Sequence, residues 1–253
     1  MRHAPADRST RVPRPTRRRT GAVLIAGIVM GASMPLASAP AADKMLEEAV
    51  EFTGAILYLK SKLPGLIIGA VRNGEVAIAG FGRVRDGSKD APNGDTLVRI
   101  GSITKAFTGH VLASMVADGT VKFNDPFATI TKANMIGNLT PEALLYAPGT
   151  GALYSNFAFD LLSQALSTAG KKPYETLLRE RVLKPIGMTS TTFSPTAAQR
   201  KNLFQGHNFD GKPLPDVPTP TLIQGSGGLY STPKDILRWM AWHLDRTSSK
   251  DAE

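Results

Sequence analysis

The chain of 253 residues contains no cysteine. This absence excludes disulfide scaffolds, thiol nucleophiles and cysteine metal sites, while a chain of this size can bury an adequate core without disulfides. The absence is therefore compatible with a periplasmic protein. Three histidines, His110, His207 and His243, lie beyond residue 39 without the spacing of metal ligands, and we interpret them as structural or surface residues. We expect no metal and no other cofactor.

Two motifs that would assign other functions are also missing. The sequence has no G-x-S-x-G element, which argues against an α/β-hydrolase. The stretch Gly225-Ser226-Gly227-Gly228 is not followed by Lys-Ser/Thr, so we interpret it as a tight surface turn beside a site and not as a phosphate-binding loop.

A membrane-spanning length of apolar sequence is lacking as well. The apolar run over residues 21–36 contains glycines and a proline and is shorter than the roughly 20 residues that a spanning helix needs. An arginine-rich stretch with Arg11, Arg14, Arg17, Arg18 and Arg19 precedes it and Ala37-Ser38-Ala39 follows it, which predicts a secretory signal peptide over residues 1–39. An uncleaved anchor is the alternative. We expect a periplasmic or secreted protein without stable membrane insertion after cleavage. Its export would follow the general or the twin-arginine route.

The excess of positive charge belongs mostly to that leader. The whole chain has 30 basic and 21 acidic residues, a net charge of +9. Residues 1–39 hold seven arginines and one aspartate, so residues 40–253 hold 23 basic and 20 acidic residues, a net charge of +3. A nucleic-acid partner, which only the high pI would suggest, is therefore not expected.

The remaining chain reads as one domain, residues 40–253, of the α+β class. Helical spacing over Asp43–Leu63 is followed by two strand-like runs around Asn73-Gly74, the preferred pair for a type I′ hairpin turn. Later helices are predicted over residues 103–118, 157–168, 174–182 and 233–244, and residues 194–227 are predicted to cross the surface as an irregular segment. Strands and helices do not alternate, which argues against a doubly wound sheet.

Ser102 and Lys105 stand at the head of one of these helices. Positions i and i+3 share a helix face, so the two side chains are expected to point the same way. A serine hydroxyl becomes a nucleophile when a base removes its proton, and a lysine can be that base when its surroundings favour a neutral amine. The alternative is that Ser102 caps the helix and Lys105 is solvated.

Four stretches, in order, resemble the serine β-lactamase and penicillin-binding protein superfamily, especially class C β-lactamases and their DD-peptidase relatives. The stretches are TLVRIGSITKAFTGHVLASMVADGTVKFNDP, PGTGALYSNFAFDLLSQAL, KPYETLLRERVLKPIGMTSTTF and GSGGLYSTPKDILRWMAWHL. The later ones are most similar to AmpH-like D-alanyl-D-alanine carboxypeptidase/endopeptidases. The resemblance implies an antiparallel sheet packed with helices plus a helical lobe, and serine hydrolase activity on β-lactams or D-Ala-D-Ala cell-wall peptides.

The resemblance also implies a role for each site residue. Ser102 would form the acyl-enzyme, Lys105 would be or tune its general base, and Tyr154 would carry a proton to the leaving nitrogen. Asn156 would bind Lys105 and the substrate amide, and the Ser102 backbone N–H would be one half of the oxyanion hole. The alternative for Tyr154-Ser155-Asn156 is an ordinary turn in which Asn156 caps the next helix.

Two departures from the family put activity in doubt. In the family that the sequence resembles, the strand with a Lys/His-Thr/Ser-Gly triplet also supplies the second oxyanion donor. No such triplet follows Asp235 here, and the family's closing strands and final helix have no counterpart. We therefore expect the first hairpin to remain a two-stranded ribbon. The stretch between Pro126 and Pro148 is much shorter than the corresponding stretch of the family, so a helical lobe that frames the cleft is expected to be lost. The alternative function is an inactive remnant that at most binds cell-wall peptide.

Overall fold

The computed structural model describes residues 43–125, 146–147, 149–219 and 224–248. The chain divides into two units, Met1–Ser38 and Ala39–Glu253, and all described residues belong to the second. The predicted signal peptide lies outside the described residues, as does most of the shortened stretch between Pro126 and Pro148. Within the described ranges, no helix has both the length and the apolar character that crossing a bilayer demands.

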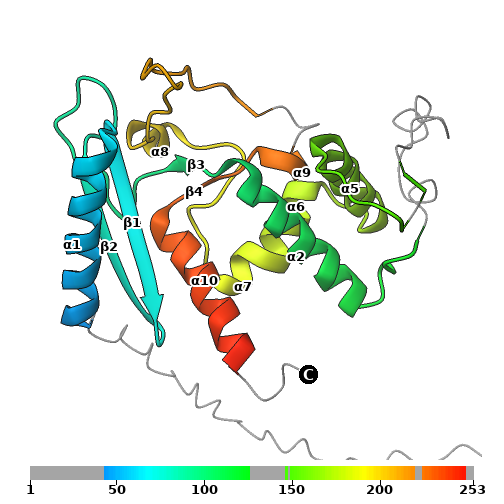
Figure 1. The fold of residues 1–253 in the computed structure, drawn as a ribbon. Helices are drawn as coiled ribbons and strands as arrows, with labels where there is room; N and C mark the ends of the chain where they lie inside the picture. Colours follow the sequence, from blue (N-terminus) through cyan, green and yellow to red (C-terminus); the bar gives the residue numbers. More distant parts are fainter. Residues whose placement is uncertain (1–42, 126–145, 148, 220–223, 249–253) are drawn as a thin grey trace, which may run out of the picture. The chain divides into compact units, whose positions relative to one another are not determined.

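The described part is built from helices and two small antiparallel sheets (Figure 1). In chain order, the elements are α1 (Lys44–Ser61), β1 (Gly65–Arg72), β2 (Glu75–Gly82), β3 (Val98–Arg99), the 3-10 turn η1 (Gly101–Ile103), α2 (Thr104–Ala117), α5 (Asn156–Ala169), α6 (Tyr174–Leu178), the π-helical turn η3 (Arg179–Leu183), α7 (Lys184–Ile186), α8 (Ala197–Lys201), α9 (Gln224–Gly227), β4 (Tyr230–Ser231) and α10 (Pro233–Ser248).

The first helix and hairpin form where the sequence predicts them. The Asp43 side chain accepts a hydrogen bond from the Met45 N–H and so caps α1. Strands β1 and β2 pair antiparallel, with Arg72 opposite Glu75. Asn73 and Gly74 between them both have positive φ, 53° and 80°, which is the backbone of the predicted type I′ turn.

Helix α1 covers one face of the hairpin. Leu46 and Val50 on α1 pack with Ala77 and Ala79 on β2 in a small buried cluster. The helix lies close to the sheet at Gly54, where a Cβ would stand 2.3 Å from the Phe81 ring. Helix α10 contacts β1 as well, so the hairpin has helices near both strands (Figure 1).

A larger core surrounds α2, the helix that the sequence places after the candidate nucleophile. Its residues Phe107, Val111 and Met115 are fully buried, at the spacing that predicted the helix. The partners come from α5, α6 and the segments that follow them. The buried members of this core are Phe107, Val111, Met115, Val121, Leu166, Tyr174, Leu177, Leu178, Val182, Leu183, Met188, Phe193 and Leu229. Because these side chains contact most of its length, α2 is held from several sides.

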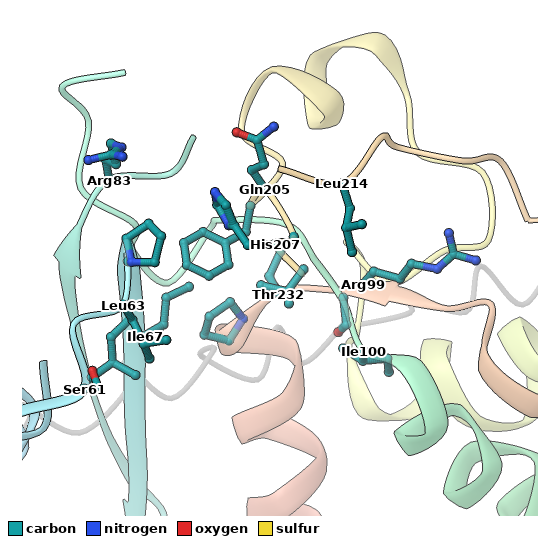
Figure 2. Close-up of a pocket in the computed structure, with 18 of the residues that line it drawn as sticks. Ser61, Leu63, Ile67, Arg83, Arg99, Ile100, Gln205, His207, Leu214 and Thr232 are labelled. Carbon is teal, nitrogen blue, oxygen red and sulfur yellow. The ribbon is translucent and has the colours of Figure 1, made fainter. Parts of the chain in front are cut away.

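The prediction of a two-stranded hairpin is confirmed. In the described residues, β1 pairs only with β2, and β3 pairs only with β4. A cavity of about 1220 Å³ opens beside β1, lined by that strand, β3, the first turns of α10 and residues 204–214 (Figure 2). Ile100 and Ile103 line it, whereas Ser102 between them does not. The cavity therefore borders the head of α2 without containing the candidate nucleophile.

Two local predictions are corrected by the structure. The helix expected over residues 174–182 is divided into α6, η3 and α7, and it ends at Gly187 with φ 78°. The segment predicted as a surface turn at residues 225–228 overlaps the short helix α9, in which Gly225 and Ser226 are buried. The glycines there favour a prediction of exposure, but Gly225 permits close packing against α5.

Candidate active site

A sharp turn after β3 brings Ser102 to the head of α2. Gly101 has a φ of 53°, in the left-handed region that glycine adopts at lower cost than other residues. Ser102 follows it in the 3-10 turn η1. The Thr104 hydroxyl donates to the Gly101 carbonyl at 2.6 Å and fixes this turn. Ser102 thus lies where the first N–H groups of a helix lack intrahelical partners and where negative charge is favoured.

Lys105 is buried one helical turn further on. Only 8% of the residue is exposed, which is unusual for lysine and is tolerated when the amine is hydrogen-bonded. Its Nζ donates to Asn156 Oδ1 at 2.7 Å and to the Ser226 carbonyl at 2.6 Å. A third, longer contact of 3.5 Å reaches Ser102 Oγ. The alternative of a solvated lysine is therefore wrong.

Tyr154 closes the site from the other side of Ser102. Its hydroxyl donates to Ser102 Oγ at 2.6 Å, and its ring centroid lies 4.6 Å from Lys105 Nζ. Hydrogen bonding with the Lys105 amine, and then with the Ser102 hydroxyl, lowers the pKa of the Tyr154 phenol below its usual value. Because 66% of Tyr154 is exposed, the phenol is open to solvent and to a substrate.

Asn156 is the first residue of α5 and not its cap. The Ser155 side chain accepts from the Ala158 N–H at 3.0 Å, so Ser155 occupies the N-cap position. The Asn156 side chain is thereby available to accept from Lys105. The alternative in which Asn156 caps the helix is wrong, because the cap lies one residue earlier, at Ser155.

The structure brings together all four predicted site residues, Ser102, Lys105, Tyr154 and Asn156. It adds Ser226 and Asp160, which sequence reasoning missed. Ser226 contributes its carbonyl to Lys105, and Asp160 on α5 binds Ser226 in turn. An aspartate in the apolar face of a predicted helix was the signal that could have found Asp160, whereas a backbone carbonyl leaves no trace in the sequence.

The three histidines are placed away from these residues. His110 and His243 pack with Trp242 where α2 meets α10, and His207 Nε2 lies 3.8 Å from Asp86 Oδ2. Among the described residues, no three His, Asp or Glu side chains are grouped as metal ligands would be. The expectation of a site without metal or cofactor stays a prediction.

The fold and the arrangement of Ser102, Lys105 and Tyr154 are similar to those of serine hydrolases that carry a Ser-x-x-Lys helix and a nearby tyrosine. The comparison with family models agrees. The Beta-lactamase family model matches residues 42–134 and 129–253, and the chain belongs to this family.

The curated relatives include both activities that the resemblance implies. The chain is 31% identical over 232 residues to the D-alanyl-D-alanine-carboxypeptidase/endopeptidase AmpH of Escherichia coli K12, covering 74% of this chain and 59% of that protein. It is 24% identical over 230 residues to a Beta-lactamase of Pseudomonas fluorescens, covering 77% of this chain and 64% of that protein. The chain thus spans about three fifths of the length of these relatives.

Solved structures confirm the predicted fold class. A Beta-lactamase/D-alanine carboxypeptidase from Yersinia pestis matches with a TM-score of 0.60 and 28% identity, over 79% of this chain and 68% of that one. The D-alanine carboxypeptidase AmpC from Burkholderia cenocepacia matches with a TM-score of 0.68 and 25% identity, over 79% and 64% of the two chains. The α+β arrangement of this family is therefore the fold of this chain.

Proposed function

We propose that the chain is an exported serine hydrolase that forms an acyl-enzyme at Ser102 with β-lactams or with D-Ala-D-Ala cell-wall peptides. One observation carries the proposal: Ser102 Oγ lies within hydrogen-bond reach of two proton-transferring groups, the Tyr154 hydroxyl at 2.6 Å and Lys105 Nζ at 3.5 Å. A nucleophile, a base and a group that orients the base are the parts that acyl transfer needs.

The distances favour Tyr154 as the group that removes the proton from Ser102. Its oxygen is nearer than the amine, and hydrogen bonding with Lys105 lowers the pKa of the phenol and so favours the phenolate form that can accept a proton. Two of the Lys105 hydrogens are directed to Asn156 and Ser226 by shorter bonds. Lys105 then serves mainly to stabilise the phenolate and to hold Ser102 in place.

The bonds change in two steps during acylation. The Ser102 oxygen forms a bond to the substrate carbonyl carbon while its proton passes to Tyr154, which leaves negative charge on the carbonyl oxygen. The bond from carbon to the leaving nitrogen then breaks, and Tyr154 returns the proton to that nitrogen. Hydrolysis of the ester releases the acyl group and regenerates the Ser102 hydroxyl.

The backbone N–H of Ser102 is the proposed donor to the negative carbonyl oxygen. It lies in the first turn of the helical segment, where N–H groups and the positive end of the helix favour an anion. In other serine hydrolases, one such donor contributes about 3–4 kcal/mol to the transition state.

The choice of substrate class rests on the relatives. AmpH is named as a carboxypeptidase/endopeptidase for D-alanyl-D-alanine and other relatives as β-lactamases, so both amide types are candidates for the acylation of Ser102. The arginine-rich, apolar amino terminus supports export to the compartment where such cell-wall peptides occur.

Labelling with a fluorescent penicillin tests the proposal. The purified chain should acquire one covalent label, located on the peptide that contains Ser102, and the Ser102→Ala variant should acquire none. A wild-type protein that is folded, as judged by a cooperative thermal transition, but is never labelled would contradict the acyl-enzyme mechanism.

A second candidate is that the chain binds cell-wall peptide without turnover. The observation in its favour is that, in the described residues, both sheets have only two strands. This candidate predicts saturable binding of a D-Ala-D-Ala peptide by calorimetry, together with the absence of a covalent penicillin label.

A further inference from the structure

The buried carboxylate of Asp160 has no role in the proposed steps. Asp160 lies on α5, one helical turn beyond Asn156, and is 8% exposed. A buried carboxylate is costly unless hydrogen bonds or opposite charges compensate for the lost water. Hydrogen-bond donors are therefore expected beside both of its oxygens, and Ser226 provides them.

Both oxygens of Asp160 bind the same residue. Oδ1 accepts from the Ser226 backbone N–H at 2.9 Å, and Oδ2 accepts from the Ser226 hydroxyl at 3.1 Å. Burial raises the pKa of Asp160, while the Ser226 hydrogen bonds and the charge of Lys105 oppose that rise. The carboxylate therefore fixes two of the three polar groups of Ser226.

The third polar group of Ser226 is the carbonyl that binds Lys105. Nζ donates to it at 2.6 Å, the shorter of its two close bonds. A continuous path thus runs from Asp160 through Ser226 to the amine beside the nucleophile. No atom of this path needs to touch a substrate.

Close packing keeps α9 in the position that this path requires. A Cβ on Gly225 would stand 2.1 Å from the Phe159 carbonyl oxygen, so only glycine lets α9 approach the backbone of α5 this closely. From the side of α2, the Thr108 hydroxyl binds the Gly225 carbonyl at 2.8 Å and the Tyr174 hydroxyl at 2.7 Å. The helix α9 is therefore held between α2 and α5.

We propose that Asp160 is the positioning residue for Lys105 and acts through Ser226. By fixing the N–H and hydroxyl of Ser226, the carboxylate aims the Ser226 carbonyl at Nζ, and the amine keeps its remaining contact with Ser102. Loss of the carboxylate leaves two buried donors without an acceptor, which favours displacement of α9. The inference rests on the proposed function, because it gives Lys105 a part in the reaction.

Three variants separate the elements of this path. Asp160→Ala removes both acceptors, whereas Asp160→Asn is isosteric and can bind the Ser226 N–H and hydroxyl by one accepted and one donated bond. Ser226→Ala removes the hydroxyl and keeps the backbone groups. Asp118→Asn is the matched control, since this exposed carboxylate pairs with Arg181 away from the site.

Penicillin acylation kinetics give the first readout. For Asp160→Ala, the acylation rate constant should fall by about tenfold, a part of the 10²–10⁴ that acid–base groups contribute, while the dissociation constant of the noncovalent complex stays unchanged. Asp160→Asn should retain most of the wild-type rate, and Asp118→Asn all of it. If Asp160 only stabilised the fold, Asp160→Ala would lower the melting temperature without lowering the acylation rate constant at an unchanged dissociation constant. Unchanged acylation in Asp160→Ala would overturn the proposal.

Chemical modification gives a second readout that needs no activity. An amine-acetylating reagent followed by peptide mass mapping should modify Lys105 several-fold faster in Asp160→Ala than in the wild type, with the exposed Lys171 as internal reference. If the wild type takes no penicillin label but Lys105 becomes more reactive in Asp160→Ala, the proposed function fails and the positioning role stands. Unchanged Lys105 reactivity would overturn the positioning role in either case.

Discussion

The Tyr154 hydroxyl lies 2.6 Å from Ser102 Oγ, and the same tyrosine presents its ring to Lys105 Nζ at 4.6 Å. One aromatic side chain thereby connects the candidate nucleophile with a buried positive charge. Hydrogen bonding with Lys105 is the largest cause that lowers the pKa of the phenol, so the phenolate forms at a lower pH than in a free tyrosine.

The first prediction concerns the titration of that phenol. The Tyr154 phenol should titrate below the usual value of about 10, and Lys105→Met should move its pKa upward by removing the main cause of the shift. The measurement is the phenolate absorbance as a function of pH, taken as the difference between each protein and its Tyr154→Phe counterpart. Identical titration of Tyr154 with and without Lys105 would contradict the assignment.

The sign of the pH dependence follows from the direction of the shift. A pKa that is lower in the folded protein means that the ionised phenol favours the folded state, so this contribution is present above the unfolded pKa and is lost as pH falls through the folded pKa. The acylation rate should rise with pH over the same folded-state titration, because the phenolate is the proposed base. A rate that falls through this titration would exclude Tyr154 as the base.

The second prediction concerns the turn before the candidate nucleophile, Ser102. A methyl group at Gly101 would meet no atom within 4 Å, so Gly101→Ala tests the φ of 53° alone. The variant should lose about 1 kcal/mol of unfolding free energy, the usual cost of a left-handed non-glycine residue, and acylation should fall because Ser102 is the next residue. Urea denaturation and penicillin labelling measure the two effects, and an unchanged stability would show that this turn is not strained by alanine.

Much of the site could be predicted because it depends on local sequence. The spacing of Ser102 and Lys105, in the consecutive helical segments η1 and α2, fixes their relative direction, and the Asn73-Gly74 turn fixes the hairpin register. The order of the motifs adds Tyr154 and Asn156, which meet the helix from a distant segment. These are features in which a short pattern determines the geometry.

The rest could not be predicted because it depends on contacts between distant segments. The Ser226 carbonyl reaches Lys105 across 121 positions of sequence, and a backbone group has no residue signature. Its neighbouring glycines favoured a surface turn, whereas the structure uses Gly225 to pack against α5. Local propensity describes what a glycine permits, and tertiary packing decides whether that freedom serves exposure or close approach.

The third prediction separates two adjacent residues with different roles. Ser155→Ala removes the cap of α5 and should cost about 1 kcal/mol of unfolding free energy while leaving acylation close to the wild type. Asn156→Ala removes the acceptor of the 2.7 Å bond from Lys105 and should slow acylation by more than its effect on stability explains. Denaturation curves together with acylation rates distinguish them. The reverse pattern would mean that Asn156, and not Ser155, is the residue that caps the helix.

The fourth prediction compares two glycines of the same short helix. Gly225→Ala would place a Cβ 2.1 Å from the Phe159 carbonyl oxygen, and because the neighbour is backbone, α9 must move away from α5. Overpacking of this kind costs about 1–3 kcal/mol, and the shift should also withdraw the Ser226 carbonyl from Lys105 and slow penicillin labelling. Gly227→Ala is the matched control, since its Cβ would have no neighbour nearer than 3.8 Å. Equal stability and equal labelling in the two variants would show that the contact between α9 and α5 does not hold the lysine in place.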